Sequence, residues 1–149
     1  MEMINGHIFK DMLASGANNL SNKFTEIDAL NVFPVPDGDT GTNMSLTFNA
    51  GVKDALACSS EDVCDIAKVL SKGLLMGARG NSGVITSQIF RGLYQGMDGM
   101  KEVNGFQLAN ALVMGSRVAY KAVMRPVEGT ILTVVREAAD YTYAYATSI

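Results

Sequence analysis

Residues 31–44, Asn-Val-Phe-Pro-Val-Pro-Asp-Gly-Asp-Thr-Gly-Thr-Asn-Met, restrict the fold more than any other stretch of the chain. The two prolines lack backbone donors and fix φ, so this segment can be neither a central strand nor a helix interior. The glycines allow backbone turns that other residues avoid. The segment is therefore predicted to be a stiff approach to a tight loop, with Asp37 and Asp39 at its tip.

Two carboxylates this close repel each other unless a cation or several hydrogen-bond donors hold them. A hard cation with oxygen ligands, Mg²⁺ above all, suits Asp37 and Asp39. The structural alternative is an Asx-type turn that caps the following helix. An EF-hand fails, because its sixth-position glycine and twelfth-position glutamate would fall on Thr42 and Phe48. An aspartyl-nucleophile phosphatase would need an apolar strand where the prolines stand.

The rest of the sequence indicates one domain of 149 residues, long enough for a core. A formal net charge of −3 without a long basic run argues against nucleic-acid binding. No apolar run is long enough for a membrane span, and the N-terminus lacks the features of a signal peptide. Cys58 and Cys64 fit neither a zinc motif nor a disulfide framework and are expected to be thiols in a reducing cytoplasm. The single histidine, His7, gives no convincing catalytic triad.

Apolar residues at helical spacing, separated by glycine-rich turns, predict an all-α chain without strands. Asn104 and Gln107 have the spacing of a capping box, and Thr130 can cap the last helix. The sequence after Tyr141 carries no stop signal, so the chain is expected to end within a helix. The predicted helices cover about residues 6–21, 41–57, 62–77, 82–94, 105–124 and 131 onward, with a short helical turn near 26–30.

A second loop, Gly77-Ala78-Arg79-Gly80-Asn81-Ser82-Gly83, joins two predicted helices. Its glycines let the backbone approach a ligand, and the next helix offers unpaired N–H groups and a positive dipole, which together suit a phosphate. Arg79 could add a charged donor and Ser82 a hydroxyl. Alone, this loop is better explained as an ordinary helix–helix turn. Paired with the loop that carries Asp37 and Asp39, called the carboxylate loop below, it supplies the second half of a magnesium–nucleotide site.

Two further groups of polar residues lie at predicted helix starts. Thr40, Thr42 and Asn43 follow the aspartates, and they either cap that helix or donate to a nucleotide phosphate. Glu128 and Thr130 follow Pro126, and by themselves they indicate a helix boundary.

Three segments together resemble the N-terminal, nucleotide-binding domain of bacterial fatty acid kinases, which is similar to the ATP-binding subunit of dihydroxyacetone kinases. They are residues 31–44, residues 71–85 (Ser-Lys-Gly-Leu-Leu-Met-Gly-Ala-Arg-Gly-Asn-Ser-Gly-Val-Ile) and residues 121–134 (Lys-Ala-Val-Met-Arg-Pro-Val-Glu-Gly-Thr-Ile-Leu-Thr-Val). The likeness covers essentially the whole chain, and the combination is highly specific. It implies an antiparallel helical barrel or bundle that holds ATP or ADP at one rim through two Mg²⁺ ions.

The resemblance also implies roles for individual residues. Asp37 and Asp39 would ligate the metals, and Asn31 is the nearest counterpart of a third aspartate in the dihydroxyacetone kinase branch. The residues near the phosphates would be Thr40, Thr42 and Asn43, the loop of Gly77, Ala78, Arg79, Gly80, Asn81, Ser82 and Gly83, and Thr130. No catalytic residue follows from the sequence.

The implied activity is phosphorylation of a fatty acid that a separate acyl-binding protein presents. The family domain continues through further helices and is followed by domains that engage this partner. Residues 1–149 are therefore expected to form an incomplete ATP-binding kinase domain, truncated at its C-terminal side and inactive alone. A dihydroxyacetone-type kinase subunit and a non-catalytic nucleotide-binding module remain as alternatives. An exposed flank where helices are missing could support a homo-oligomer.

Overall fold

The computed structural model describes residues 2–149, which form six α-helices and one pair of two-residue strands. In chain order these are β1 (Met3–Ile4), α1 (Gly6–Ala29), α2 (Thr40–Ala57), α3 (Val63–Gly77), α4 (Gly80–Gly96), β2 (Val103–Asn104), α5 (Gly105–Ala122) and α6 (Ile131–Ser148). The predicted all-α class is confirmed. The antiparallel pairing of β1 with β2 was not predicted, because two residues are too few to show an alternating pattern.

Several helix boundaries differ from the prediction by a few residues, and two of them border the loops of interest. Helix α1 continues to Ala29 and includes the turn predicted near 26–30. The prediction ended this helix too early because residues 21–26 are all exposed and carry no apolar periodicity. Helix α4 begins at Gly80 rather than at Ser82 or Gly83. Gly80 has a φ of +68°, in the left-handed region that glycine tolerates, so the chain turns into the helix at this residue.

The predicted caps of the last two helices are present. The Asn104 side chain accepts a hydrogen bond of 2.8 Å from the Gln107 N–H, and the Gln107 side chain accepts one of 2.9 Å from the Asn104 N–H. This reciprocal pair is the capping box that the sequence indicated. Thr130 caps α6, because its hydroxyl oxygen accepts from the Leu132 N–H at 3.3 Å.

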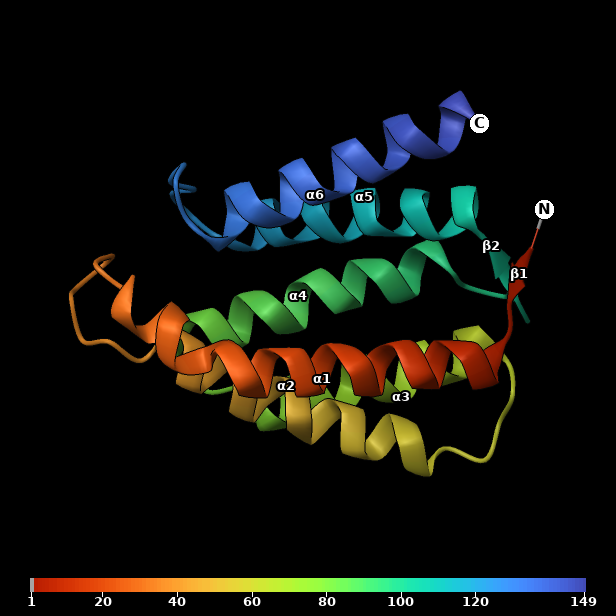
Figure 1. Ribbon diagram of the computed structural model, residues 1–149, viewed down its shortest axis with the longest axis horizontal. Helices are drawn as coiled ribbons and strands as arrows, with labels where there is room; N and C mark the ends of the chain where they lie inside the picture. Colours follow the sequence, from red (N-terminus) through yellow and green to blue (C-terminus); the bar gives the residue numbers. More distant parts are fainter. Residues whose placement is uncertain (1) are drawn as a thin grey trace.

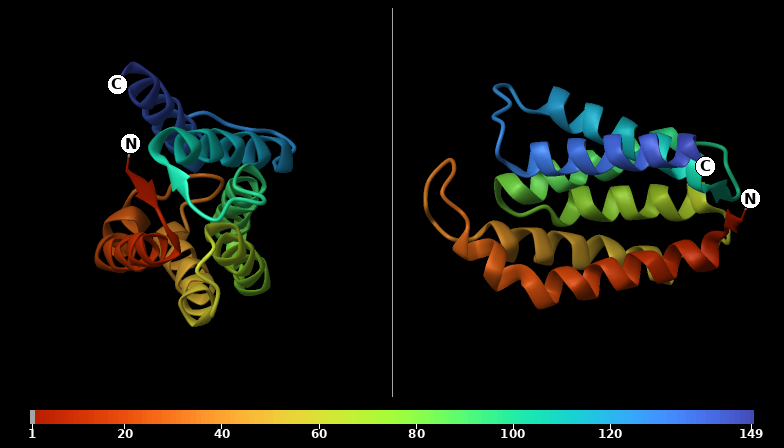
Figure 2. Two further views of the ribbon diagram at one scale, coloured as in Figure 1. Left: turned by 90° about the vertical axis from the view of Figure 1, so that its right-hand side faces the viewer. Right: turned by 45° about the horizontal axis from the view of Figure 1, so that its top comes forward.

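Successive helices run in opposite directions along the bundle, so α2, α4 and α6 all begin at one end (Figure 1). Each helix packs against the next in the chain, and α2 also packs against α4. Seen along the bundle, the helices follow an arc from α1 to α6 (Figure 2, left). The end where α2, α4 and α6 begin is called the loop end below, because residues 30–39 project from it.

The main core lies between α1, α2, α3 and α4. Helix α3 contributes its buried centre, where Ile66, Leu70 and Leu74 are fully enclosed. Phe48 of α2 and Phe90 of α4 pack with ring centroids 5.2 Å apart. This contact joins two of the three helices that begin at the loop end. Burial of these side chains supplies the main stabilisation of the bundle, and it holds α2 and α4 in register.

Helices α4 and α5 approach each other through glycines. A Cβ on Gly92 would lie 2.5 Å from the Gly115 Cα, and a Cβ on Gly115 would lie 2.5 Å from the Ile89 carbonyl oxygen. No side chain fits at these distances, so the backbones themselves are in contact. This contact attaches α5, and with it α6, to the four-helix core.

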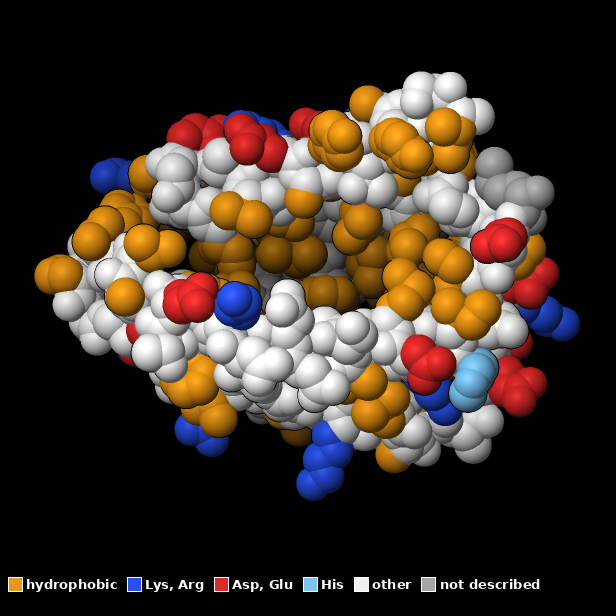
Figure 3. All heavy atoms as spheres, viewed as in Figure 1, with side chains coloured by type: hydrophobic (Ala, Val, Ile, Leu, Met, Phe, Trp, Pro, Cys, Tyr) orange, Lys and Arg blue, Asp and Glu red, His pale blue; other side chains and the backbone are white. Residues whose placement is uncertain are grey.

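Between α1 and α6 the arc stays open. Figure 3 shows a hollow with hydrophobic side chains along this opening. Helix α6 packs mainly on α5 and buries only Leu132 and Ala139, while Tyr141 and Tyr145 are exposed. The structure is thus an open bundle rather than a closed barrel. Among the helices described, none has both the length and the apolarity that crossing a bilayer requires.

Candidate functional site

The loop end brings together the segments that the sequence singled out. Residues 30–39 precede α2, residues 78 and 79 precede α4, and residues 123–130 precede α6 (Figure 1). Three helix N-termini therefore point toward this end, and each contributes partial positive charge. The caps of these helices differ, and the differences show where an anion could bind.

Asn31 shapes the carboxylate loop through both ends of its amide. Its Oδ1 accepts hydrogen bonds from the backbone N–H groups of Asp39 (3.0 Å) and Thr40 (3.1 Å). Its Nδ2 donates to the carbonyls of Phe33 (3.2 Å) and Val35 (3.4 Å). The amide is thus engaged with the loop backbone, and the metal-ligand role of Asn31 stays a prediction.

Asp37 and Asp39 form a close pair of acids at the exposed tip. Desolvation in the loop, followed by a hydrogen bond and charge repulsion from Asp39, raises the pKa of the Asp37 carboxyl above its ordinary value. Within residues 2–149, neither carboxylate has a Lys, Arg or His nitrogen within 4.0 Å. The pair therefore carries negative charge that no basic side chain compensates.

The chemistry of these donors fits Mg²⁺. The described residues contain no group of three or more His, Cys, Asp or Glu side chains that could enclose a metal. Mg²⁺ does not need such a cage, because it is commonly bound by one or two carboxylates, several waters and the phosphates of a substrate. Asp37 and Asp39 provide that kind of incomplete, all-oxygen site.

Asp28, which sequence analysis did not identify, lies near the end of α1 and caps α2 from outside. Its Oδ1 accepts from the Thr42 N–H at 2.8 Å, and its Oδ2 accepts from the Thr42 hydroxyl at 2.5 Å. Burial acts to raise the pKa of Asp28, but these bonds and one from the Gly41 N–H outweigh it and hold that pKa below its ordinary value. One sequence feature could have pointed to this role. An acid near a helix C-terminus interacts unfavourably with the helix dipole, which suggests that hydrogen-bond donors from another segment stabilise it.

The loop from Gly77 to Gly83, called the glycine loop below, is joined to α2 by two hydrogen bonds. The Arg79 N–H donates to the Thr47 hydroxyl at 3.0 Å, and the Ser82 hydroxyl donates to the Thr40 carbonyl at 3.2 Å. Thr47 is fully buried and was not identified from the sequence. Its position among the apolar residues of α2 was the available signal, since a buried hydroxyl requires a partner.

Close contacts also lock this loop against α2. A Cβ on Gly80 would lie 2.4 Å from the Asn43 side-chain nitrogen, and one on Gly83 would lie 2.4 Å from the Thr47 hydroxyl oxygen. A Cβ on Gly77 would lie 2.8 Å from the Ala50 Cβ. The glycine loop therefore lies against the first turns of α2, which follow directly after Asp39. The exposed Arg79 has no acidic partner among the described residues.

The start of α4 is the one at the loop end that has no side-chain cap of any kind. Its N-cap residue, Arg79, caps nothing with its side chain, whereas Asp28 caps α2 and Thr130 caps α6. No hydrogen bond from the N–H groups of Gly80, Asn81 or Ser82 is recorded among the described residues. Unpaired N–H groups at a helix start, with the dipole behind them, form a binding site for an anion.

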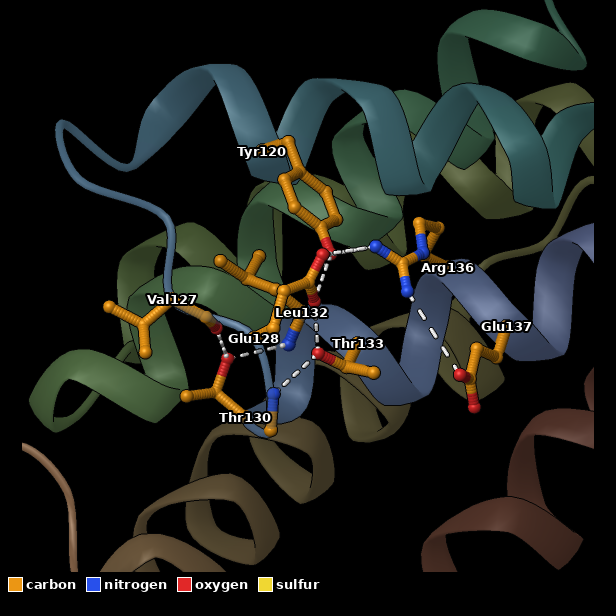
Figure 4. Close-up of polar contacts among 9 residues, drawn as sticks. Tyr120, Val127, Glu128, Thr130, Leu132, Thr133, Arg136 and Glu137 are labelled. Carbon is orange, nitrogen blue, oxygen red and sulfur yellow. Dashed lines mark hydrogen bonds and ion pairs between the residues drawn. The ribbon is translucent and has the colours of Figure 1, made fainter.

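A polar network holds the segment before α6 (Figure 4). Glu128 pairs with Arg136, accepts from the Tyr120 hydroxyl at 3.1 Å, and accepts from the Thr133 hydroxyl. The bond from Thr133, assisted by Arg136 and Tyr120, lowers the pKa of Glu128. Thr130 donates to the Val127 carbonyl at 2.7 Å. Thr130 thus lies at the loop end, as predicted, but its hydroxyl is occupied within its own segment.

Two small cavities, of about 240 and 210 Å³, lie at the opposite end of the bundle and share Gly6, His7 and Glu61 in their linings. His7 is exposed and has Asp11 at 3.7 Å. The helix that borders them, α1, is capped by the Asn5 side chain, which accepts from the Ile8 N–H. The carboxylate loop and the uncapped start of α4 lie at the loop end, where the candidate site is an exposed surface.

Comparisons with known proteins show the family of this chain. The family model of the DAK2 domain matches residues 34–148. The chain is 54% identical over 136 residues to the protein YloV of Bacillus subtilis, which covers 91% of this chain and 25% of that protein. It is 54% identical over 142 residues (95% of this chain, 26% of the relative) to an uncharacterized protein of Staphylococcus epidermidis. An uncharacterized protein of Staphylococcus haemolyticus is 55% identical over 136 residues. The chain spans about a quarter of the length of these relatives.

Proposed function

This chain belongs to the DAK2 family of dihydroxyacetone kinase-like nucleotide-binding domains, and we propose that it binds ATP or ADP with Mg²⁺ at the loop end. The observation that supports this most strongly is the uncapped start of α4 beside the carboxylate loop. The bonds from Ser82 to Thr40 and from Arg79 to Thr47 hold the two segments together. The proposed phosphate-binding turn would thus lie next to the start of α2, which directly follows the proposed metal ligands.

The phosphates would bind at the N–H groups of Gly80, Asn81 and Ser82. These groups have no partner among the described residues, and the dipole of α4 favours negative charge in front of them. Arg79 is exposed beside them and could add a guanidinium to the same phosphates. Asn43, which contacts Gly80, keeps the glycine backbone in place.

The metal would be held by Asp37 and Asp39, with oxygen atoms of the phosphates and water completing its ligands. Two such ions are expected from the likeness to fatty acid kinases. When bound, Mg²⁺ supplies positive charge that offsets the carboxylates and the phosphates. The contribution of this chain to phosphoryl transfer would then be positioning and charge stabilisation.

For the complete protein we propose a kinase that phosphorylates a fatty acid held by an acyl-binding partner. The support is the likeness of residues 31–44, 71–85 and 121–134 to fatty acid kinases. Because the chain spans about a quarter of its relatives, the acyl substrate and its partner would be engaged by other parts of the protein. A dihydroxyacetone-type kinase subunit is the second candidate, supported by the family of the domain.

Amide chemical shifts test the nucleotide proposal. Titration of the ¹⁵N-labelled chain with ADP and Mg²⁺ should shift the amide signals of Gly80, Asn81 and Ser82 most, because their N–H groups gain a partner. The signals near the cavities at the opposite end should not move. Shifts confined to that opposite end would reject the site.

The substrate is tested with the full-length protein. Transfer of phosphate from ATP to an acyl group on a fatty-acid-binding protein, without transfer to dihydroxyacetone in the presence of a dihydroxyacetone-binding subunit, supports the fatty acid kinase. The reverse pattern supports the second candidate. Nucleotide binding without transfer to either would indicate a non-catalytic module.

A further inference from the structure

We propose that Asp28 is a positioning residue of the metal site, which fixes the start of α2 and thereby the place of Asp39 and Asp37 beside the glycine loop. This inference rests on the proposed function, since it assigns Asp28 a part in that same site. Asp28 would not touch the metal or the nucleotide. It would act through the backbone and side chain of Thr42.

Asp28 contacts both ends of the carboxylate loop. Its carboxylate receives the N–H and the hydroxyl of Thr42, and also the N–H of Gly41. Its backbone carbonyl accepts from the Asn31 N–H at 3.1 Å and lies 3.7 Å from where a Cβ on Gly38 would be. One residue of α1 therefore determines where the loop leaves α1 and where it enters α2.

The packing of α1 on α2 leaves little room for another arrangement. A Cβ on Gly41 would lie 2.2 Å from the Phe24 carbonyl oxygen, so the two backbones are in direct contact. Within that contact, the Asp28 carboxylate pairs with the N–H groups of Gly41 and Thr42 in the first turn of α2. Without it, those groups would lose their acceptor, and the first turn of α2, which follows Asp39 directly, would lose its anchor.

The Asp28 carboxylate also decides which helix can receive a phosphate. It already provides the anion at the N-terminus of α2, so the positive end of that helix is neutralised within the protein. The Thr42 hydroxyl has a single proton and donates it to Asp28, so it cannot also donate to a phosphate. The N–H groups at the start of α4 remain free. Of these two helix starts, only that of α4 is therefore available to a phosphate.

The sequence around Asp28 indicates a purpose beyond the stability of α1. An acid in the last turn of a helix is unfavourable for that helix, and α1 has no basic residue there. Helix α2, in turn, has no acid in its own first turn. The Asp28 carboxylate is thus unfavourable for α1, but it supplies the negative charge that the first turn of α2 does not carry itself.

The experiment compares ADP affinity in Mg²⁺ with ADP affinity in EDTA, both read from the shifts of the Gly80 to Ser82 amide signals. Asp28→Ala should lower the ratio of the two affinities by about tenfold, the scale of effects when the support of a metal site is removed. Affinity in EDTA should stay at the wild-type value, because α4 is unchanged. Asp28→Asn keeps an acceptor for the Thr42 N–H and should retain most of the ratio.

A second pair of variants tests the same contact from α2. Thr42→Ser keeps the hydroxyl and should match the wild type, whereas Thr42→Val should lower the ratio in the same direction as Asp28→Ala. Asp11→Ala is the matched control, since Asp11 is an exposed aspartate on α1 whose recorded partner is the exposed His7. Circular dichroism verifies that each variant is helical at the temperature of the titration.

Two outcomes would overturn the inference. A wild-type ratio in both Asp28→Ala and Thr42→Val would show that the contact does not serve the metal site. An equal loss of affinity in Mg²⁺ and in EDTA would show a general structural role only. Failure of the proposed function has a different signature, because the wild-type chain itself would then bind ADP equally with and without Mg²⁺.

Discussion

The hydroxyl of Thr47, in the buried interior of α2, accepts the backbone N–H of Arg79 at 3.0 Å, directly before α4 begins. This bond crosses from the helix that follows the carboxylate loop to the loop that would hold phosphate. It satisfies the last N–H before the uncapped turn, so that the open N–H groups begin at Gly80. The relative position of the two halves of the site therefore depends on a residue outside both motifs.

Replacement of Thr47 by valine should destabilise the chain, because the Arg79 N–H loses its acceptor, the buried Thr47 hydroxyl. The expected loss is about 1–3 kcal/mol in the free energy of unfolding, measured by urea denaturation. Thr47→Ser retains the hydroxyl and should lose less. Thr142→Val is the control, because Thr142 is a half-buried threonine on α6 whose hydroxyl donates to the Ala138 carbonyl in an exposed bond. Equal stability of Thr47→Val and wild type would mean that this bond does not anchor the glycine loop.

Replacement of Asp37 by asparagine should separate stability from binding. The raised pKa of Asp37 means that the folded chain holds this proton more tightly than the unfolded chain. The group therefore stabilises at low pH and loses this contribution as pH rises through the folded pKa. At pH 7 in EDTA, the melting temperature of Asp37→Asn should equal or exceed that of the wild type, while Mg²⁺-dependent ADP binding is lost. Asp98→Asn, on an exposed turn elsewhere, should change neither.

A lower melting temperature for Asp37→Asn, or retained Mg²⁺-dependent binding in the double variant with Asp39→Asn, would contradict the metal assignment. The first result would mean that Asp37 stabilises the loop. The second would mean that the cation is held by other groups.

The Asp28 carboxyl should make the chain sensitive to acid. Its pKa in the folded chain lies below the ordinary value of 3.8, so its stabilising contribution is present above that value and is lost as pH falls through the folded pKa. Asp28→Asn does not titrate, and its urea midpoint should fall less than that of the wild type between pH 5 and pH 3. Parallel curves for the two proteins would show that Asp28 is not held in its charged form.

The glycine contact between α4 and α5 should not tolerate a methyl group. Gly115→Ala would place a Cβ 2.5 Å from the Ile89 carbonyl oxygen, so the helices must separate, at a cost of about 1–3 kcal/mol in stability. Gly105→Ala, at the start of the same helix, has no neighbour within 4 Å and serves as the control. Its stability should match or exceed the wild type, because alanine restricts the unfolded chain. Similar midpoints for both variants would contradict backbone contact at Gly115.

The helices could be predicted where one buried face makes apolar residues recur at helical spacing. The predictions failed where no such face exists. Helix α3 is apolar along one face and was located from Val63 to Gly77 with little error. The prediction ended α1 near residue 21 and placed a separate turn near 26–30, because residues 21–26 are exposed and no periodicity marks them as helical. The start of α4 was placed too late, because an extended Arg79 and a left-handed Gly80 leave no side-chain cap to recognise.

The two motifs of the candidate site were visible in the sequence, but their connections were not. Proline and glycine patterns locate Asp37, Asp39 and the loop from Gly77 to Gly83 without tertiary information. Asp28 and Thr47 act across helices, through contacts that only the packing of α1, α2 and α4 creates. Asn31 makes hydrogen bonds to the loop backbone that its position in the sequence did not indicate, and its part as a metal ligand stays a prediction.

The central claim is that phosphates bind at the start of α4 with a cation held by Asp37 and Asp39. Calorimetric titration of the chain with ADP, in Mg²⁺ and again in EDTA, tests it most directly. Binding in Mg²⁺ that is lost or greatly weakened in EDTA is the expected result. Equal affinity in the two buffers, or no binding by a chain that circular dichroism shows to be helical, would contradict the claim.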